Sequence, residues 1–344
     1  MKQLLNTLYV TTPNAYLRLD GETVCIMVDK QKRLQVPLHH LSAFVLFDHV
    51  MLSPALLGRC AADGRSIIWL NRSGRFMARM EGPVNGNILL RQAQFKASEE
   101  AQQCLQLACS FIAGKIRNSR QLLMRAARDC KNQHDKDSLQ QASSLLAGNL
   151  KKLQQLDNLD ALRGIEGDSA HLYFAALPNA IRPSARTIFS FHTRTRRPPK
   201  DRFNALISFL YALMLGECRS ALETVGLDPQ LGFLHAVRPG RESLALDLLE
   251  EFRAPFCDRL ALTLINREQI KKKDFEEREG GSVLLNDDGR KTVINAFQSR
   301  KQEEIIHPVL EQSVTIGLLA QIQARILARY LRKDIDHYLP FLQQ

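Results

Sequence analysis

Acidic residues and one histidine in three separate stretches of the sequence could together hold a divalent cation. The first stretch is 163–168, Arg-Gly-Ile-Glu-Gly-Asp, where Glu166 lies between two glycines inside a helical pattern of apolar residues. Each glycine destabilises a helix by about 1 kcal/mol relative to alanine. That cost is tolerable where a metal-bound phosphate must approach the backbone closely. An exposed acid at a junction between helices would give the same pattern.

The second stretch is Gly-Phe-Leu-His at 232–235, which ends in His235 and leads into a loop containing Arg238 and Arg241. An imidazole can bind a metal or transfer a proton near neutral pH. A lone histidine after an apolar run is, however, more often a buried residue whose nitrogens are hydrogen bonded. The stretch by itself therefore leaves a structural role open.

The third stretch, 243–253, contains three acids among leucines. Asp247 and Glu250 are three residues apart and share one face of a predicted helix, and Glu251 lies on a neighbouring line of that helix. Like charges at this spacing repel, and a divalent cation reverses the sign of that interaction. A charged outer face is the alternative, although the surrounding leucines leave little polar surface. Two carboxylates and one imidazole suit Mg²⁺ or Mn²⁺, and the nitrogen ligand favours manganese.

The charge of the chain favours a polyanionic partner, because its net value is +11. Residues 1–90 carry ten Lys/Arg and six Asp/Glu, or +4, which leaves +7 for the rest. Segment 182–202 holds seven basic residues and one acid, so it supplies +6 of that charge, and three prolines stiffen it. A pre-ordered basic loop suits a DNA backbone, although a solvated basic loop would have the same composition.

Residues 1–84 are predicted to form a small β domain, because short runs rich in Val, Ile, Phe and Tyr alternate with turn signals. Ser53 is a plausible N-cap for one short helix, 53–62, with Pro54 at its first position. Strands at this spacing favour a β-sandwich. The predicted strands are 8–10, 15–19, 23–28, 43–47, 66–70 and 75–80.

Residues 85–344 are predicted to form a large all-α domain, which makes the fold class α+β. Glycine and proline nearly vanish from 87–162, and apolar residues recur there at helical spacing. Residues 275–285 pass through two glycines and are predicted to form a short hairpin or ordered loop. No stretch is typical of a membrane span or a secretory signal, so we expect a cytoplasmic protein. Further helices are expected at 159–177, 201–225, 243–266, 290–300 and 314–333.

Taken together, these motifs resemble the universal CRISPR-associated integrase family, the first Cas protein. The resemblance is carried by Gly-x-Glu-Gly at 164–167, Gly-Phe-Leu-His at 232–235 and Ser-Leu-x-Leu-Asp-Leu-x-Glu-x-Phe-Arg at 243–253. Arg-Arg-Pro-Pro at 196–199, which runs into Asn-Ala-Leu at 204–206, and Gly-Arg-Lys at 289–291 add to it. Any one motif is weak, but their joint order and spacing cover essentially the whole chain.

The resemblance implies a site and a set of partners. Glu166, His235 and Glu250 are expected to hold the Mg²⁺ or Mn²⁺ ion, with Asp247 as a supporting catalytic acid at the edge of the shell. The implied partners are double-stranded DNA (a spacer precursor and the repeat array), a second copy of the chain in a homodimer, and the small second Cas protein. Contacts to DNA are expected from Arg163, Arg186, Arg194, Arg196, Arg197, Lys200, Arg238, Arg241 and Arg253.

The implied activity is the insertion of short foreign DNA fragments as new spacers into a CRISPR array. A 3′-hydroxyl would attack a phosphodiester at the edge of a repeat, which conserves the number of phosphodiester bonds and requires no nucleotide cofactor. Two other hypotheses remain open: a metal-dependent nuclease that acts on branched DNA repair intermediates, and a DNA-binding scaffold whose acids are structural. Strand joining with a 3′-hydroxyl substrate distinguishes the first from both others.

Overall fold

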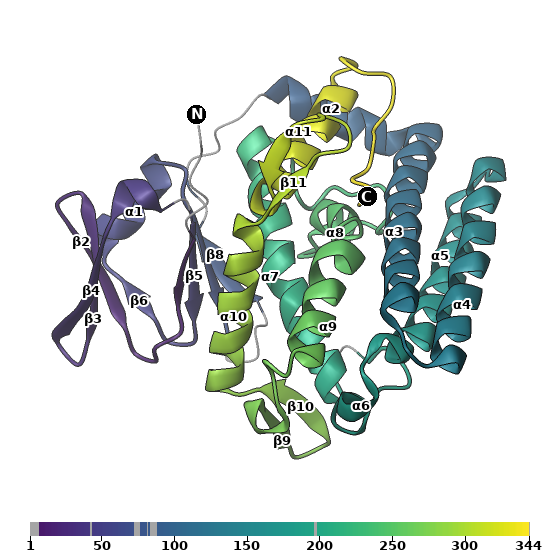
Figure 1. Ribbon diagram of the computed structural model, residues 1–344. Helices are drawn as coiled ribbons and strands as arrows, with labels where there is room; N and C mark the ends of the chain where they lie inside the picture. Colours follow the sequence, from purple (N-terminus) through teal and green to yellow (C-terminus); the bar gives the residue numbers. More distant parts are fainter. Residues whose placement is uncertain are drawn as a thin grey trace.

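Strands dominate the chain before residue 82 and helices dominate it after residue 87 (Figure 1). The computed structural model describes residues 7–41, 43–71, 76–80, 82, 88–195 and 198–343. The N-terminal elements are β1 (Thr7–Val10), β2 (Tyr16–Asp20), β3 (Thr23–Val28), β4 (Gln31–Pro37), β5 (Ala43–Phe47), β6 (Met51–Leu52), α1 (Pro54–Ala62), β7 (Ser66–Leu70) and β8 (Phe76–Met80). The mixed α and β composition predicted from the sequence is confirmed.

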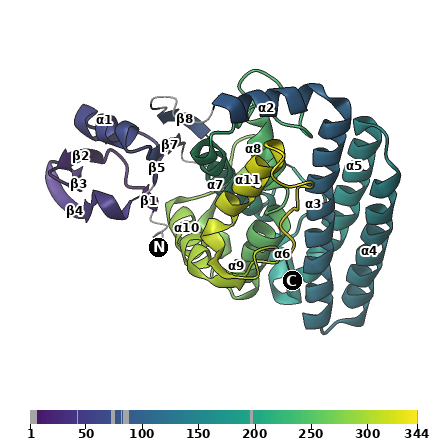
Figure 2. The same ribbon diagram turned by 90° about the horizontal axis from the view of Figure 1, so that it is seen from above.

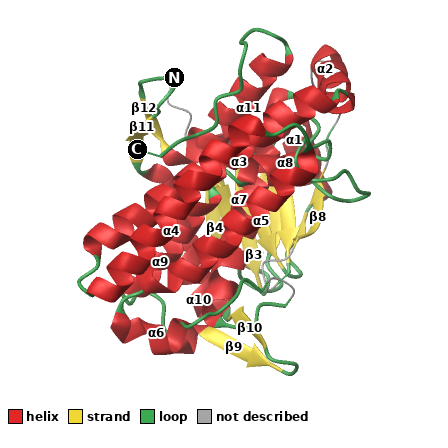
Figure 3. Ribbon diagram, turned by 90° about the vertical axis from the view of Figure 1, so that its right-hand side faces the viewer, coloured by secondary structure: helices red, strands yellow, loops and turns green. Residues whose placement is uncertain are grey.

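The helical part begins with three helices, of which the middle one is the longest. It ends with a helix that precedes a tail without regular secondary structure (Figure 3). Its elements are α2 (Ile88–Glu99), α3 (Ala101–Asp129), α4 (Gln133–Lys152), α5 (Leu159–Ala176), α6 (Pro183–Phe189), α7 (Arg202–Val225), α8 (Ser243–Leu249), α9 (Arg259–Asn266), β9 (Phe275–Arg278), β10 (Ser282–Leu285), α10 (Asp287–Gln302), β11 (Glu304–Ile306), β12 (Ser313–Thr315) and α11 (Leu319–Leu331).

The N-terminal strands form two four-stranded sheets, in the orders β1-β5-β7-β8 and β4-β3-β2-β6. All six predicted strands and the predicted helix are present, and the Ser53 hydroxyl accepts a hydrogen bond from the Leu56 N–H at 3.2 Å. The sequence prediction missed β4, whose residues are mostly exposed, and the two-residue β6. Both are edge strands of their sheet, and an edge strand can be short or largely exposed, so its sequence contains few apolar residues to identify it.

The central strands of the sheet β1-β5-β7-β8, β5 and β7, are buried on both faces. Along β5, Phe44 and Leu46 join a hydrophobic cluster with the other sheet and α1, whereas Val45 and Phe47 join the core of the helical part. The Phe47 ring stacks on Phe209 of α7 with centroids 6.2 Å apart. Strands β1, β5 and β7 pair in parallel, and parallel strands covered on both faces have the continuous apolar sequence observed here.

Helix α7 forms the centre of the helical part, between the sheet and the other helices (Figures 1 and 2). It is the one described helix long and apolar enough to cross a membrane, but 67% of its most apolar window is buried inside the protein. Its apolar surface is therefore covered by protein. The carboxylate of Asp201 caps its first turn by accepting from the Asn204 N–H at 2.7 Å, and Gly226 ends it in a left-handed conformation.

Two sequence predictions about the helical part are wrong. The domain is not all-α, because β9 pairs with β10 and β11 pairs with β12 as antiparallel hairpins. The first of these is the hairpin predicted at 275–285. The single helix predicted at 243–266 is also interrupted: α8 ends at Leu249, a turn follows, and Arg253–Asp258 adopts π-helical bonding before α9. Pro255 lies in that stretch and cannot donate a backbone hydrogen bond, and short π-helical turns often mark functional sites.

Candidate active site

The segment 232–235 is held against the first turns of α8 by a close backbone contact. A Cβ atom at Gly232 would lie 2.7 Å from Ser243 and 2.8 Å from the Asp247 Oδ2 atom. Only glycine allows this approach. The contact brings His235 next to the helix that carries Asp247 and ends just before Glu250.

Asp247 is fully buried and organises this segment. Its Oδ2 atom accepts from the N–H groups of Phe233 and Leu234 at 2.7 and 3.0 Å, and its Oδ1 atom accepts from the His235 N–H at 3.0 Å. Oδ1 also lies 2.6 Å from the His235 Nδ1 atom. A carboxylate surrounded by donors needs Nδ1 to donate as well, which leaves the lone pair of the imidazole on Nε2. The Nε2 atom lies 3.9 Å from the Glu250 Oε1 atom.

Lys115 of α3 lies between the two predicted catalytic glutamates. Its ammonium forms an ion pair with Glu166 of α5 and another with the Glu250 Oε2 atom at 2.9 Å. The Glu166 side chain is 31% exposed, whereas that of Glu250 is 4% exposed. A Cβ atom at either glycine flanking Glu166 would meet nothing within 4 Å. Both glycines are exposed, so the helix surface on either side of Glu166 is open.

Glu250 is a strongly ionised carboxylate despite its burial. Burial raises the pKa of its carboxyl group, but the positive charges of Arg253 and Lys115 outweigh burial and lower the pKa to about 2. Arg253 approaches from the next turn, with its Nε atom 3.1 Å from the Glu250 Oε1 atom. The negative charge that a cation or a proton donor would face is thus present at any working pH.

The donor set fits a divalent cation, but the side chains are not arranged around one. Among the described residues, no group of three or more His, Cys, Asp and Glu side chains is placed to hold a metal ion. The Lys115 ammonium supplies the positive charge between Glu166 and Glu250 instead. The buried Glu250 Oε2 atom meets the Lys115 ammonium, and the lone pair of His235 Nε2 faces the same acid. Two carboxylate ligands and one nitrogen, with a third carboxylate behind the imidazole, match the ligand chemistry of Mg²⁺ or Mn²⁺.

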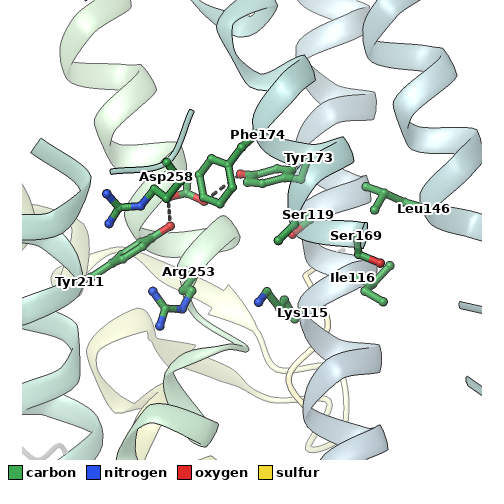
Figure 4. A pocket seen from close by; sticks show the side chains of 12 residues that line it. Lys115, Ile116, Ser119, Leu146, Ser169, Tyr173, Phe174, Tyr211, Arg253 and Asp258 are labelled. Carbon is green, nitrogen blue, oxygen red and sulfur yellow. Dashed lines mark hydrogen bonds between the residues drawn. The ribbon is translucent and has the colours of Figure 1, made fainter. Parts of the chain in front are cut away.

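A small pocket adjoins the cluster on the side of Lys115 and Arg253 (Figure 4). On its far wall the hydroxyls of Tyr173 and Tyr211 donate to Asp258 at 2.8 and 2.7 Å. Burial raises the pKa of Asp258 to about 6, although the two hydroxyls oppose that shift. The Arg253 guanidinium lies over the Tyr211 ring, 4.5 Å from its centroid. The pocket wall therefore fixes the arginine that faces Glu250.

Some of the residues predicted to contact DNA are held by other groups of the protein, and others lie near the candidate site and are at least partly exposed. Arg186 pairs with Asp135 at 2.7 Å, and Arg194 donates to Asn204 and Ser208. Arg253 faces Glu250, and Lys200 donates to the Gly280 carbonyl at 2.7 Å. Arg238 is exposed and Arg241 half-buried, both in the loop that follows His235, and Arg163 pairs with exposed Asp160 one turn before Glu166. Arg196 and Arg197 lie outside the described residues.

Lys115 was not predicted from the sequence. The sequence nevertheless contains an indication of its role, because Lys115 lies between Ile112 and Ile116 in a helix whose apolar residues face the core. A lysine on that line should either extend to the surface or meet an acid. Its partners could not be identified, since Glu166 and Glu250 are 51 and 135 residues away in the chain.

The chain belongs to the family of CRISPR associated protein Cas1, whose sequence pattern matches residues 8–299. It is 51% identical to CRISPR-associated endonuclease Cas1 1 of Moorella thermoacetica, over 99% of each chain. It is 49% identical to CRISPR-associated endonuclease Cas1 1 of Chlorobaculum tepidum, again over 99% of each chain. The family predicted from the motifs is confirmed.

Solved structures share the fold at lower sequence identity. A CAS1 protein from Thermotoga maritima superposes with a TM-score of 0.82 at 23% identity and covers 98% of this chain and 100% of its own. A casposase bound to integration product gives 0.83 at 21% identity, over 98% and 94%. A chain of a Cas6-RT-Cas1–Cas2 complex gives 0.84 at 20%, over all of this chain and 37% of its own. These likenesses extend over the strands and the helices alike.

Proposed function

We propose that this Cas1 protein is a metal-dependent DNA integrase that inserts short DNA fragments as new spacers into a CRISPR array. The observation that carries the proposal is the approach of Glu166 and Glu250 to one half-buried lysine, Lys115, with the His235 Nε2 atom 3.9 Å from Glu250. These acids and the histidine come from three distant stretches of the chain. A scaffold that only bound DNA would need no buried, ionised acid there. The near relatives are named endonucleases, and the casposase of the same fold holds an integration product.

Glu166, His235 and Glu250 would hold Mg²⁺ or Mn²⁺ in this proposal. When bound, the cation would supply Lewis acidity for the scissile phosphate and for the attacking and departing oxygens. Asp247 orients His235 through Nδ1 and keeps Nε2 available for coordination or for a proton. Lys115 and Arg253 hold Glu250 ionised and place positive charge beside the phosphate position. These last contributions come from the chain itself.

The proposed reaction is a transesterification. The 3′-hydroxyl of the incoming fragment forms a new phosphorus–oxygen bond at the edge of a repeat, and the bond to the resident 3′-oxygen breaks. The attacking hydroxyl loses a proton and the departing oxygen gains one. The two glycines that flank Glu166 leave the backbone open for a sugar–phosphate chain to approach. Arg163, Arg238 and Arg241 lie near the same cluster in the sequence and are proposed to contact the DNA backbone.

The decisive experiment is product analysis on a repeat-containing duplex with a labelled fragment that ends in a 3′-hydroxyl. We expect joined product with Mn²⁺ or Mg²⁺, and none with chelator or with a 3′-deoxy fragment. The alternative, a nuclease that acts on branched repair intermediates, uses the same residues with water as the nucleophile. Cleaved but unjoined product on branched and repeat substrates alike would favour that alternative and reject the integrase.

The proposed assembly is a homodimer that works with the small second Cas protein in the cytoplasm. We infer that residues 1–84 form the dimer domain and that its two sheets pack as a sandwich around their shared core, with 85–344 as the catalytic domain. Leu34, Met51 and Met77 support this, because they are exposed apolar side chains on the edge strands β4, β6 and β8. The Cas1–Cas2 complex of the same fold supports the second partner. Light scattering of the full chain that finds only monomer would reject the dimer.

A further inference from the structure

A second basic site lies on the side of α3 that faces away from Lys115. A cleft of about 530 Å³ is lined there by Arg117, Arg120 and Gln121 of α3, Leu150 of α4, Pro308, and Leu342 with Gln343 near the chain end. At about 100° per residue, Arg117 and Arg120 are turned roughly 200° and 140° around the helix from Lys115. The cleft is therefore separate from the catalytic cluster.

The two arginines lack acidic partners. Within the described ranges neither Arg117 nor Arg120 forms an ion pair, and the Arg120 Nε atom is buried without a hydrogen bond. No acidic side chain lines the cleft there. By contrast, Arg186, Arg202 and Arg219 each face a carboxylate of the chain. A guanidinium that is partly desolvated and unpaired favours binding of an anion from outside.

The cleft is also pre-organised, because the C-terminal segment that forms one wall is fixed to α3. The Asn118 side chain donates to the Phe341 carbonyl at 2.8 Å and accepts from the Gln343 N–H at 2.9 Å. The Phe341 N–H in turn donates to buried Glu251 at 2.7 Å. The wall next to Arg117 and Arg120 is thus attached by buried hydrogen bonds, and a ligand would not have to order it.

We propose that this cleft binds the sugar–phosphate backbone of a DNA strand, as a contact distinct from the catalytic site. Two guanidiniums can each hold a phosphate oxygen, the amides of Gln121 and Gln343 can donate further hydrogen bonds, and the apolar wall offers a surface for sugars and bases. Helix α3 continues with Arg125 and Arg128 and has one acid, Asp129, beyond Lys115. That extended basic line matches a polyanionic strand better than a single phosphate. The choice of DNA rests on the proposed function.

The test is fluorescence anisotropy with the full-length protein and a labelled single strand of about twenty nucleotides, titrated at several salt concentrations. The double variant Arg117→Gln, Arg120→Gln should lose about tenfold in affinity. The slope of log affinity against log salt should fall by about 1.4, which is two contacts at about 0.7 each. The variant Arg117→Lys, Arg120→Lys should keep most of the slope, since it retains the charge.

The control is Arg325→Gln, Arg329→Gln, which removes two exposed arginines of α11 that do not line the cleft. An equal loss in both double variants would overturn the site, because it would mean that only the general charge of the chain matters. An unchanged slope in the cleft variant would overturn the site as well. So would equal displacement of the labelled DNA strand by poly-glutamate from the wild type and from the cleft variant. Binding is measured without metal or joining, so failure of the integrase proposal would leave this result standing.

Discussion

Two neighbouring glutamates point to opposite sides of the same turn and have opposite surroundings. Glu250 faces two cationic groups, Lys115 and Arg253, and its pKa is lowered to about 2. Glu251 is also buried, but its neighbours are neutral donors: the Tyr338 hydroxyl, the Gln323 amide and the Phe341 N–H. Burial outweighs those hydrogen bonds and raises the pKa of Glu251 to about 8.

The comparison teaches that burial alone does not give an acid its role. Glu250 is placed to carry a negative charge in the candidate site, and Glu251 fastens the C-terminal segment to α3 and α11. The sequence expectation that Glu251 repels Asp247 is wrong, because the helix ends at Leu249 and Glu251 turns toward the tail. Asp247 has its own compensation in three backbone N–H groups.

The largest expected effect separates the two glutamates by function. Glu250→Gln should lower the strand-joining rate by about a thousandfold or more, because a neutral amide cannot replace an anionic ligand. Glu251→Gln keeps the shape of its side chain and should change the rate by less than about tenfold. Single-turnover joining on a repeat duplex measures both, with DNA affinity measured alongside. Comparable loss in both variants would break the comparison.

Folding has to be checked in the same experiment, because Glu250→Gln leaves Lys115 and Arg253 without their buried anion. Removing one partner of a buried ion pair costs about 3–5 kcal/mol, so the apo protein should become less stable and not more. Glu166→Gln is the second variant, since the Glu166 side chain is 31% exposed and should affect stability less. Joining at the wild-type rate in Glu166→Gln would remove the metal-site proposal.

The next effect concerns the group that orients His235. Asp247→Asn should lower Mn²⁺ affinity and joining by about 10–100-fold, as is usual for the carboxylate behind a metal-binding imidazole. Asp135→Asn is a matched control, because Asp135 is another buried acid, paired with Arg186 away from the cluster. It should reduce stability and leave Mn²⁺ affinity unchanged. Isothermal titration with Mn²⁺ distinguishes them, and equal affinities would show that Asp247 is only structural.

Much of the fold could be predicted from the sequence, because its signals are local. Alternating or continuous apolar runs identified six strands, Ser53 and Pro54 identified the start of α1, and Asp201 and Gly226 lie at the two ends of the predicted helix that became α7. The helix at 243–266 failed for a local reason that was visible, the proline at 255. What the periodicity could not reveal is where regular helical bonding ends, at Leu249, and where π-helical bonding begins, at Arg253.

The candidate site was predictable in its acids and not in its cations. Glu166, Asp247 and Glu250 stand out because carboxylates are costly among apolar residues. Lys115, Tyr211 and Asp258 are ordinary members of their helices until the chain is folded, since their partners are distant in sequence. The DNA contacts were predicted from charge and from the family resemblance, and neither can tell Arg186, which pairs with Asp135, from exposed Arg238.

A smaller effect tests the contact between Glu251 and the C-terminal segment. Tyr338→Phe removes a hydrogen bond to buried Glu251 and should lower the free energy of unfolding by about 1–3 kcal/mol, with joining per folded molecule within a few-fold of wild type. Tyr330→Phe is the matched control, because its hydroxyl makes only a 3.4 Å contact to exposed Gln106. It should cost less than about 0.5 kcal/mol. Urea unfolding provides both values, and equal costs would mean that the Tyr338 bond does not secure the tail.

The last difference between the two glutamates is in how stability depends on pH. Glu250 has a folded pKa of about 2, below its unfolded value, so its contribution is present above about pH 4.5 and is lost as the pH falls through about 2. Glu251 has a folded pKa of about 8, above its unfolded value, so its contribution is present below about pH 4.5 and is lost as the pH rises through about 8.

Between about pH 5 and 8, therefore, only Glu251 of the two changes the free energy of unfolding, and it lowers that free energy as the pH rises. Urea unfolding across this range should give a steeper decline for wild type than for Glu251→Gln, while the other acids and bases are common to both proteins and cancel in the difference. Parallel curves would mean that the three donors keep Glu251 ionised throughout, and the two glutamates would then differ in their partners but not in their charge.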